Sequence, residues 1–324
     1  MFNNVKIALG YEIRNGPWGG GNKFLKSFKS YFEAKGAKIT DKLEENTDII
    51  FLFNPRRKIG TFDYRDAKRY KRRFPETKII FRINDNDRTG RNYKGDRLRL
   101  KTCKISDGVV FISEWLCDYF IEKGFDTKTC HAVIRNGSDK NIFNTDGYIP
   151  WRKGEPMKIV THHWSDNCMK GADVYQHFDE LLEDPWMRSH FEFTYIGRIP
   201  RVPSEIHFKH THCIPPLDGI ELARELKKHH VYLTASQWEA CGMHQLEGAC
   251  CGLPVLFRDE GGGIVETCQG YGIQFSKSTF VISLFKMLEK YHQFQPKMND
   301  FPFTAKEMNN EYEKFILNVL NRKE

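Results

Sequence analysis

One polar block in the second half of the chain, residues 236–252, constrains the fold more than any other feature of the sequence. An apolar run precedes it at residues 231–235 and another follows at residues 253–257, and each has the length and composition of a buried strand. The block between them is therefore predicted to be a turn that opens into a helix. Strand, turn, helix and strand in this order are typical of an α/β fold with a parallel sheet.

Two carboxylates, Glu239 and Glu247, stand eight positions apart in this block. On a helix that spacing spans roughly 12 Å, which is too far for the two groups to share a proton or a metal ion. They can instead hold two ends of one elongated ligand. Paired glutamates also occur on solvated helix faces, but Gly242, Gly252 and Pro254, placed between two strands, favour a ligand site.

The order of these residues resembles the signature of retaining, GT-B-fold glycosyltransferases of the family 4 type, also called glycosyl transferases group 1. The resemblance implies that Glu239 contacts hydroxyls of the donor sugar, that Glu247 holds the ribose of the nucleotide, and that Gly242 belongs to the same pocket. It also covers Lys170, which precedes a glycine as the family's lysine does. That lysine neutralises the diphosphate of the donor, a task for which a point charge on a flexible stem is well suited.

A second glycine-rich segment follows the next strand and resembles the family's Gly-Gly-x-x-Glu segment. It contains Gly261, Gly262 and Gly263, with Glu266 after them. Backbone amides in such a segment are expected to bind the phosphate or the sugar, because glycine lets a ligand approach the backbone closely.

The chain departs from the family in the residue five positions before Lys170, which is Ser165 where the family usually has arginine. This departure weakens the phosphate clamp unless His162, His163 or Arg198 supplies the missing contact. The two adjacent histidines lack partners at metal-ligand spacing, so a hydrogen-bonding role is favoured over a metal site. Likewise, Asn84-Asp85 stands where family members often have His-Asp, and a general acid–base role is not expected there.

The first half of the chain alternates strand-like and helix-like patterns. Strands are predicted at residues 5–10, 48–53, 78–83, 108–112 and 131–134, and their continuous apolar character suits a parallel sheet covered on both faces. A loop with Gly19, Gly20 and Gly21 follows the first strand and leaves bare amides at a helix start, where a phosphate or sugar could bind. A plain flexible turn is the alternative.

The chain length of 324 residues predicts two domains. We expect a Rossmann-like acceptor-side domain at residues 1–150, a Rossmann-like nucleotide-sugar-binding domain at residues 151–300, and a helix at residues 301–324 that packs back on the first domain. The Asn136-Gly137 turn, which resembles a family motif, closes the first domain. The resemblance thus implies an α/β, GT-B architecture with two domains that face each other across a cleft.

Positive charge is concentrated in the first half. Residues 1–150 carry 30 Lys and Arg against 19 Asp and Glu, a net charge of +11, whereas the whole chain carries +8. A basic half can attract a phosphorylated glycan, a membrane surface or nucleic acid, although a merely soluble basic surface is equally compatible. The clusters at residues 56–58 and 68–73 are, on the simplest interpretation, solvated helix faces.

The nine cysteines are scattered, without a Cys-x-x-Cys pair, which favours reduced thiols. With no signal peptide or membrane anchor recognisable, we expect a cytoplasmic protein, peripheral at most to a membrane.

The sequence thus predicts a retaining glycosyltransferase that moves a sugar from a nucleotide sugar, a UDP- or GDP-sugar, to a glycan, a lipid-linked saccharide or another hydroxyl acceptor. No metal or cofactor is required on this interpretation. Three alternatives stay open: a glycosyltransferase acting on nucleic acid, a sugar-nucleotide epimerase or phosphorylase of the same architecture, and a non-catalytic sugar-nucleotide-binding protein.

Overall fold

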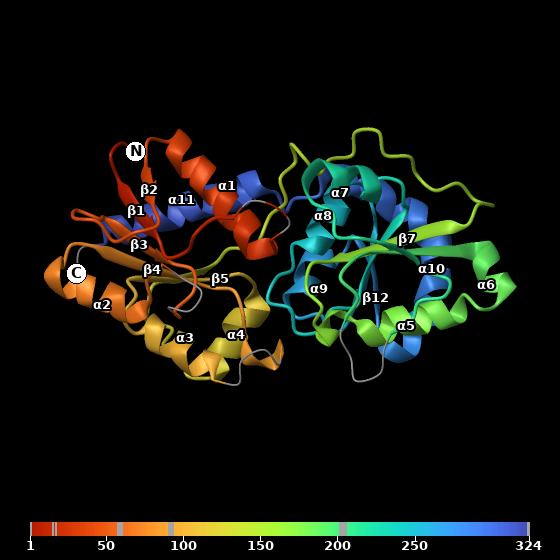
Figure 1. The fold of residues 1–324 in the computed structure, drawn as a ribbon, viewed down its shortest axis with the longest axis horizontal. Helices are drawn as coiled ribbons and strands as arrows, with labels where there is room; N and C mark the ends of the chain where they lie inside the picture. The colour runs from red at the N-terminus through yellow and green to blue at the C-terminus, as the bar shows by residue number, and fades with distance from the viewer. Residues whose placement is uncertain are drawn as a thin grey trace. The chain divides into compact units, whose positions relative to one another are not determined.

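The computed structural model describes residues 2–14, 16, 18–56, 61–89, 94–200 and 206–322. The chain forms two compact units, each with a parallel sheet and helices (Figure 1). Unit 1 comprises Met1–Asn15, Gly21–Asn136 and Ala305–Glu324, and unit 2 comprises Gly16–Gly20 and Gly137–Thr304. The chain therefore enters unit 2 briefly at the glycine-rich loop before it completes unit 1.

Unit 1 is built on a six-stranded parallel sheet with the order β2-β1-β3-β4-β5-β6. The register pairs Ile7 with Ile49 and Ile50 with Ile79. Its strands are β1 (Lys6–Leu9), β2 (Lys38–Thr40), β3 (Ile49–Leu52), β4 (Lys78–Ile83), β5 (Gly108–Phe111) and β6 (His131–Val133). Strands β3, β4 and β5 are buried almost throughout, as expected for a sheet covered on both faces.

Helices lie on both faces of this sheet, and the last helix of the chain is one of them. The first face carries α1 (Gly20–Ala34) and α11 (Ala305–Asn321), whose apolar side chains form one core with β1, β3, β4 and β5. The other face carries α2 (Tyr64–Arg73), α3 (Gly95–Cys103) and α4 (Glu114–Glu122), with the short η1 (Asp87–Thr89) before α3 (Figure 1).

A buried arginine joins α11 to this unit. Arg82, only 2% exposed, donates hydrogen bonds to the Tyr312 hydroxyl (3.0 Å) and to Asn136 Oδ1 (2.6 Å), and its guanidinium lies 4.0 Å from the centre of the Phe24 ring. A buried charge without hydrogen bonds is very unfavourable. The asparagine of the predicted Asn-Gly turn therefore holds the arginine that anchors the C-terminal helix.

Unit 2 repeats the architecture with the strand order β12-β11-β10-β7-β8-β9. Its strands are β7 (Met157–His163), β8 (Phe191–Gly197), β9 (His212–Ile214), β10 (Val231–Thr234), β11 (Val255–Arg258) and β12 (Gly272–Phe275). One face packs against α5 (Ala172–Leu181), α6 (Pro185–His190) and α10 (Phe280–Phe294). The other packs against α7 (Gly219–Leu226), α8 (His244–Cys250) and α9 (Gly263–Cys268). Short turns η2 (Cys168–Lys170), η3 (Lys277–Thr279) and η4 (Gln295–Asp300) complete the unit.

Two edge strands, β2 and β12, were not predicted. Each is short and only partly buried, so neither has the continuous apolar character by which the inner strands are recognised. Within the described part of the chain, none of the helices combines the length and apolar composition of a bilayer-crossing segment.

Candidate functional site

Three loops meet at the carboxyl ends of the strands of unit 2. From the loop after β10, the Gln237 N–H donates to the Met169 carbonyl (2.8 Å), and the Trp238 N–H donates to the Glu260 carbonyl (2.8 Å). The Glu239 carbonyl in turn accepts the Gly263 N–H (2.9 Å). Hydrogen bonds thus fix the loop after β10 to the loops that follow β7 and β11. Ligands of open α/β sheets bind at this edge.

The backbone of the β10 loop is strained immediately before the predicted catalytic glutamate. Trp238 has a φ of 50°, in the left-handed region that residues with a Cβ rarely adopt. Glu239 itself lies in the turn and not on a helix, because α8 begins only at His244. The helical spacing considered for Glu239 and Glu247 is therefore wrong, and each is positioned by a different segment.

Lys170 and Glu239, predicted to act on neighbouring parts of one ligand, form an ion pair. The Lys170 ammonium donates to Glu239 Oε2, and both side chains are largely buried, with exposed fractions of 13% and 26%. Gly171 makes this approach possible: its φ is 99°, and a Cβ on it would lie 2.4 Å from the Cβ of Ala235. Glycine is thus required where η2 passes the end of β10.

Glu247 lies on α8 and is bound from the end of β7. Its Oε2 is 2.9 Å from His162 Nε2, and its side chain is only 2% exposed. The other ring nitrogen, Nδ1, lies 3.1 Å from the Tyr232 hydroxyl. That hydroxyl also accepts the His162 backbone N–H (3.1 Å) and so can donate to Nδ1. Because a carboxylate can only accept hydrogen bonds, His162 Nε2 donates to Glu247 in this arrangement.

His163 is buried and makes hydrogen bonds within unit 2. It is 3% exposed, and its Nε2 lies 2.8 Å from the Tyr175 hydroxyl and 3.1 Å from Thr161 Oγ1. Burial lowers the pKa of His163 well below its usual value, and the positive charge of Lys170 lowers it further. The hydrogen-bonding role expected for the histidine pair therefore holds for both residues.

A cation and two indole rings gather at the ends of β7 and β8. The Arg198 guanidinium lies 4.0 Å from the ring centre of Trp164, and the ring centre of Trp18 is 5.9 Å from that of Trp164. The Arg198 N–H donates to the His163 carbonyl (3.1 Å), which aligns the two strand ends. Arg198, predicted as a phosphate ligand, is thus held over an aromatic surface beside the His162-His163 pair.

The predicted glycines differ in how much they can offer a ligand. The N–H groups of Gly261 and Gly263 already donate to the carbonyls of Arg258 (3.1 Å) and Glu239 (2.9 Å). Gly262, with a φ of 65°, has no backbone acceptor for its N–H within the described residues. Of the three amides proposed to bind the donor, only that of Gly262 can donate to a ligand without giving up a backbone hydrogen bond within the described residues.

The remaining predicted glycines are placed in different surroundings. Gly242 precedes α8, and its carbonyl accepts from Gln245 Nε2 (2.8 Å). Gly19 and Gly20 group with unit 2, where Gly19 lies against Trp164. Gly21 groups with unit 1, and a Cβ there would lie 2.6 Å from the Phe53 ring, so close packing alone accounts for this glycine.

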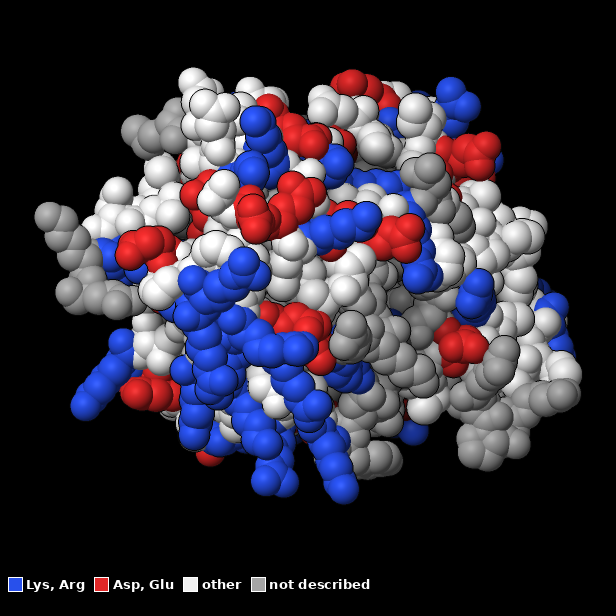
Figure 2. All heavy atoms as spheres, turned by 60° about the vertical axis from the view of Figure 1, so that its left-hand side comes forward, with Lys and Arg blue, Asp and Glu red and all other residues white. Residues whose placement is uncertain are grey.

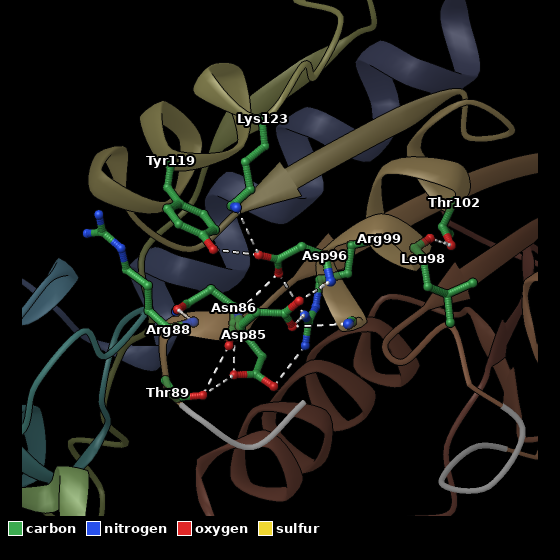
Figure 3. A network of polar contacts seen from close by, with 12 residues as sticks. Asp85, Asn86, Arg88, Thr89, Asp96, Leu98, Arg99, Thr102, Tyr119 and Lys123 are labelled. Atoms are coloured by element: carbon green, nitrogen blue, oxygen red, sulfur yellow. Dashed lines mark hydrogen bonds and ion pairs between the residues drawn. The ribbon is translucent and has the colours of Figure 1, made fainter. Parts of the chain in front are cut away.

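In unit 1, the polar run after β4 is a structural network (Figure 3). Arg99, 4% exposed, binds Asp85 (2.8 Å), Asp87 (3.3 Å) and Asp96 (3.0 Å). Asp96 also accepts from the Tyr119 hydroxyl (2.5 Å). The carboxylates therefore satisfy one buried guanidinium, which agrees with the expectation that this run is not an acid–base pair.

Sequence reasoning missed Trp18, Trp164 and His244. The ring of His244 lies 4.8 Å from that of His163, and its Nε2 is 3.0 Å from Thr234 Oγ1. Only the tertiary contacts single these residues out, because each is isolated in the sequence. Across the described part of the chain, no group of three or more His, Cys, Asp or Glu residues is arranged to hold a metal ion.

No protein-family model matches the sequence, and no curated protein matches it either. Solved structures do match. The chain is similar to sucrose-phosphate synthase from Thermosynechococcus elongatus, with 10% identity, coverage of 98% of this chain and 99% of that chain, and a TM-score of 0.70. It is similar to Alr3699/HepE of Anabaena in complex with UDP-glucose, with 12% identity, coverage of 97% and 99%, and a TM-score of 0.70.

A third similar structure is the catalytic domain of starch synthase IV from Arabidopsis thaliana bound to ADP and acarbose, with 12% identity, coverage of 99% and 100%, and a TM-score of 0.68. Likeness at this level of identity shows the fold. The chain therefore has the GT-B fold, with two Rossmann-like units, as the sequence predicted.

Proposed function

We propose that this protein is a retaining glycosyltransferase of the family 4 type that transfers a hexose from a nucleotide sugar to a hydroxyl acceptor. The observation that carries the proposal is the meeting of Lys170, Glu239 and Gly262 at one strand edge, beside the His162–Glu247 pair. Similarity to a structure that contains UDP-glucose supports a nucleotide sugar as donor. A UDP- or GDP-sugar is the donor we expect, and a glycan or lipid-linked saccharide the acceptor.

Each residue has a separate role in this proposal. Lys170 neutralises the diphosphate that leaves, with Arg198 as the second cation in place of the family's arginine. Glu239 holds hydroxyls of the transferred sugar, and the Gly262 N–H contacts the sugar or phosphate. Because the Lys170–Glu239 pair is largely buried, its electrostatic effect on developing charge is stronger than it would be in water. No protein nucleophile and no metal ion is needed for this chemistry.

The experiment compares two glutamate variants with the wild type. We expect Glu239→Ala to retain nucleotide binding and lose most turnover, and Glu247→Ala to weaken nucleotide binding. Binding is measured by calorimetry with UDP, GDP and ADP, and turnover with labelled nucleotide sugars and analysis of the anomeric configuration of the product. Wild-type turnover in both variants would contradict the assignment.

The same product analysis separates the alternatives. An epimerised sugar nucleotide or a sugar phosphate would identify an epimerase or a phosphorylase. Donor binding without transfer or hydrolysis would identify a non-catalytic binding protein. An inverted anomeric centre would contradict retention while leaving glycosyl transfer in place.

A further inference from the structure

Positive charge is concentrated on one face of unit 1. Figure 2 shows Lys and Arg side chains gathered on this face, with groups of Asp and Glu side chains at their border. The face is formed by α2 and α3, which connect β3 to β4 and β4 to β5. Because crossovers of the same hand between consecutive neighbouring strands lie on one side of a sheet, these two helices are neighbours (Figure 1).

Both helices place their cations at helical spacing on the solvent side. We call this set the basic face. It consists of the exposed residues Arg65, Lys68, Arg69, Arg72 and Arg73 of α2, and Lys94, Arg97, Lys101 and Lys104 of α3 and its ends. The α3 row is spaced three or four residues apart and extends over about 15 Å. Two parallel rows of this kind make a broad, continuous charged area and not a single ridge.

Little of this charge is neutralised within the protein. Arg69 pairs with Asp66 (2.6 Å) and Arg73 with Glu45 (3.9 Å). Lys68, Arg97 and Lys101 have no carboxylate within ion-pair distance in the described ranges. Residues 57 and 58 of the first basic cluster lie outside the described residues. Like charges placed this close repel one another, so an external anion would stabilise the face.

The composition of the basic face indicates the kind of anion. None of the large exposed apolar side chains of the described residues lies on α2 or α3. The aromatic residues of α2 and its end are engaged within the protein: Tyr70 packs on Phe74 with ring centres 4.7 Å apart, and the Arg65 guanidinium lies 5.9 Å from the centre of the Tyr64 ring. Single-stranded nucleic acids are bound through exposed aromatic rings on which the bases stack, and none of the large exposed aromatic side chains of the described residues lies on α2 or α3.

We propose that the basic face docks this protein on the surface of a membrane that contains anionic lipids. A planar array of phosphate and carboxylate headgroups needs no specific contact geometry, and clusters of Lys and Arg on a helix are sufficient to bind it. The charge asymmetry, with +11 in residues 1–150 against +8 for the whole chain, orients the protein with unit 1 towards the membrane. This inference does not depend on the proposed function.

The test uses the full chain and sedimentation with vesicles, either of phosphatidylcholine alone or with roughly 30% phosphatidylserine. The variant Lys68→Gln, Arg72→Gln, Arg97→Gln, Lys101→Gln removes four charges from the basic face. Its control, Arg152→Gln, Arg224→Gln, Lys286→Gln, Lys290→Gln, removes four exposed charges from unit 2. Melting temperatures confirm that both variants fold.

We expect the wild type and the control to bind only the anionic vesicles and to be released by high salt. The basic-face variant should bind the anionic vesicles roughly 100- to 1,000-fold more weakly than the wild type does. Equal binding to neutral vesicles, or a basic-face variant that binds like the control, would overturn the proposal. So would tighter binding to a random-sequence DNA or RNA duplex at the same salt, if that binding is lost in the basic-face variant.

Discussion

Removal of His162 tests how Glu247 is held in position. The Glu247 side chain is only 2% exposed and accepts a hydrogen bond of 2.9 Å from His162 Nε2. A hydrogen bond to a charged group contributes about 1.5–3 kcal/mol. We therefore expect His162→Ala to lower the free energy of unfolding by at least about 2 kcal/mol. His162→Gln, whose amide can still donate, should recover part of that loss.

Ligand binding by the same variants separates positioning from mere stability. If Glu247 binds the ribose, His162→Ala should weaken binding of the preferred nucleoside diphosphate by about tenfold, the equivalent of one lost hydrogen bond. Binding of its 2′-deoxy analogue should change far less. Urea unfolding followed by fluorescence and calorimetric titration with both nucleotides provide the measurements.

Two results would refute this reasoning. Unfolding of His162→Ala at the same urea concentration as the wild type would show that the histidine does not stabilise buried Glu247. Equal loss of affinity for the ribose and deoxyribose nucleotides would show that the pair acts elsewhere than at the sugar hydroxyl.

Three further predictions concern the framework. Gly171→Ala should destabilise the protein by more than Gly147→Ala does. Both glycines have a positive φ, but only at Gly171 would a Cβ lie within 4 Å of other atoms. The measurements are the unfolding free energies of both variants and donor turnover, which only Gly171→Ala should lose. Burial lowers the pKa of His229 from 6.5 to about 4. As the pH falls, this imidazole is therefore protonated in the unfolded chain at a higher pH than in the folded protein. The stability is complete above pH 6.5 and decreases by up to about 3 kcal/mol towards pH 4, a slope that His229→Gln should reduce in melting curves. Arg99→Met should cost about 3–5 kcal/mol, because the buried carboxylate of Asp96 then keeps only Lys123, 3.9 Å away, as its cation. An unchanged melting temperature would contradict the structural role of the network.

Much of the fold could be predicted from the sequence because the inner strands carry their own signal. The strands predicted at residues 78–83 and 108–112 are β4 (Lys78–Ile83) and β5 (Gly108–Phe111), with bounds that agree to within one residue. The edge strands β2 and β12 lack that signal, since an edge strand is held mainly by its neighbour's backbone hydrogen bonds. Their existence depends on the sheet that is already formed.

For the candidate site, the sequence determined the residue types at the strand ends: Lys170 before a glycine, Glu239 and Glu247 after β10, and the three glycines after β11. These follow from local order along the chain. Only the tertiary structure decided that the Lys170 ammonium meets Glu239 and that His162 holds Glu247. It also decided which of the three glycine amides, that of Gly262, has no backbone acceptor within the described residues. Such contacts join residues that are far apart in the sequence. These residues come together because the parallel sheet places the carboxyl ends of their strands at the same edge.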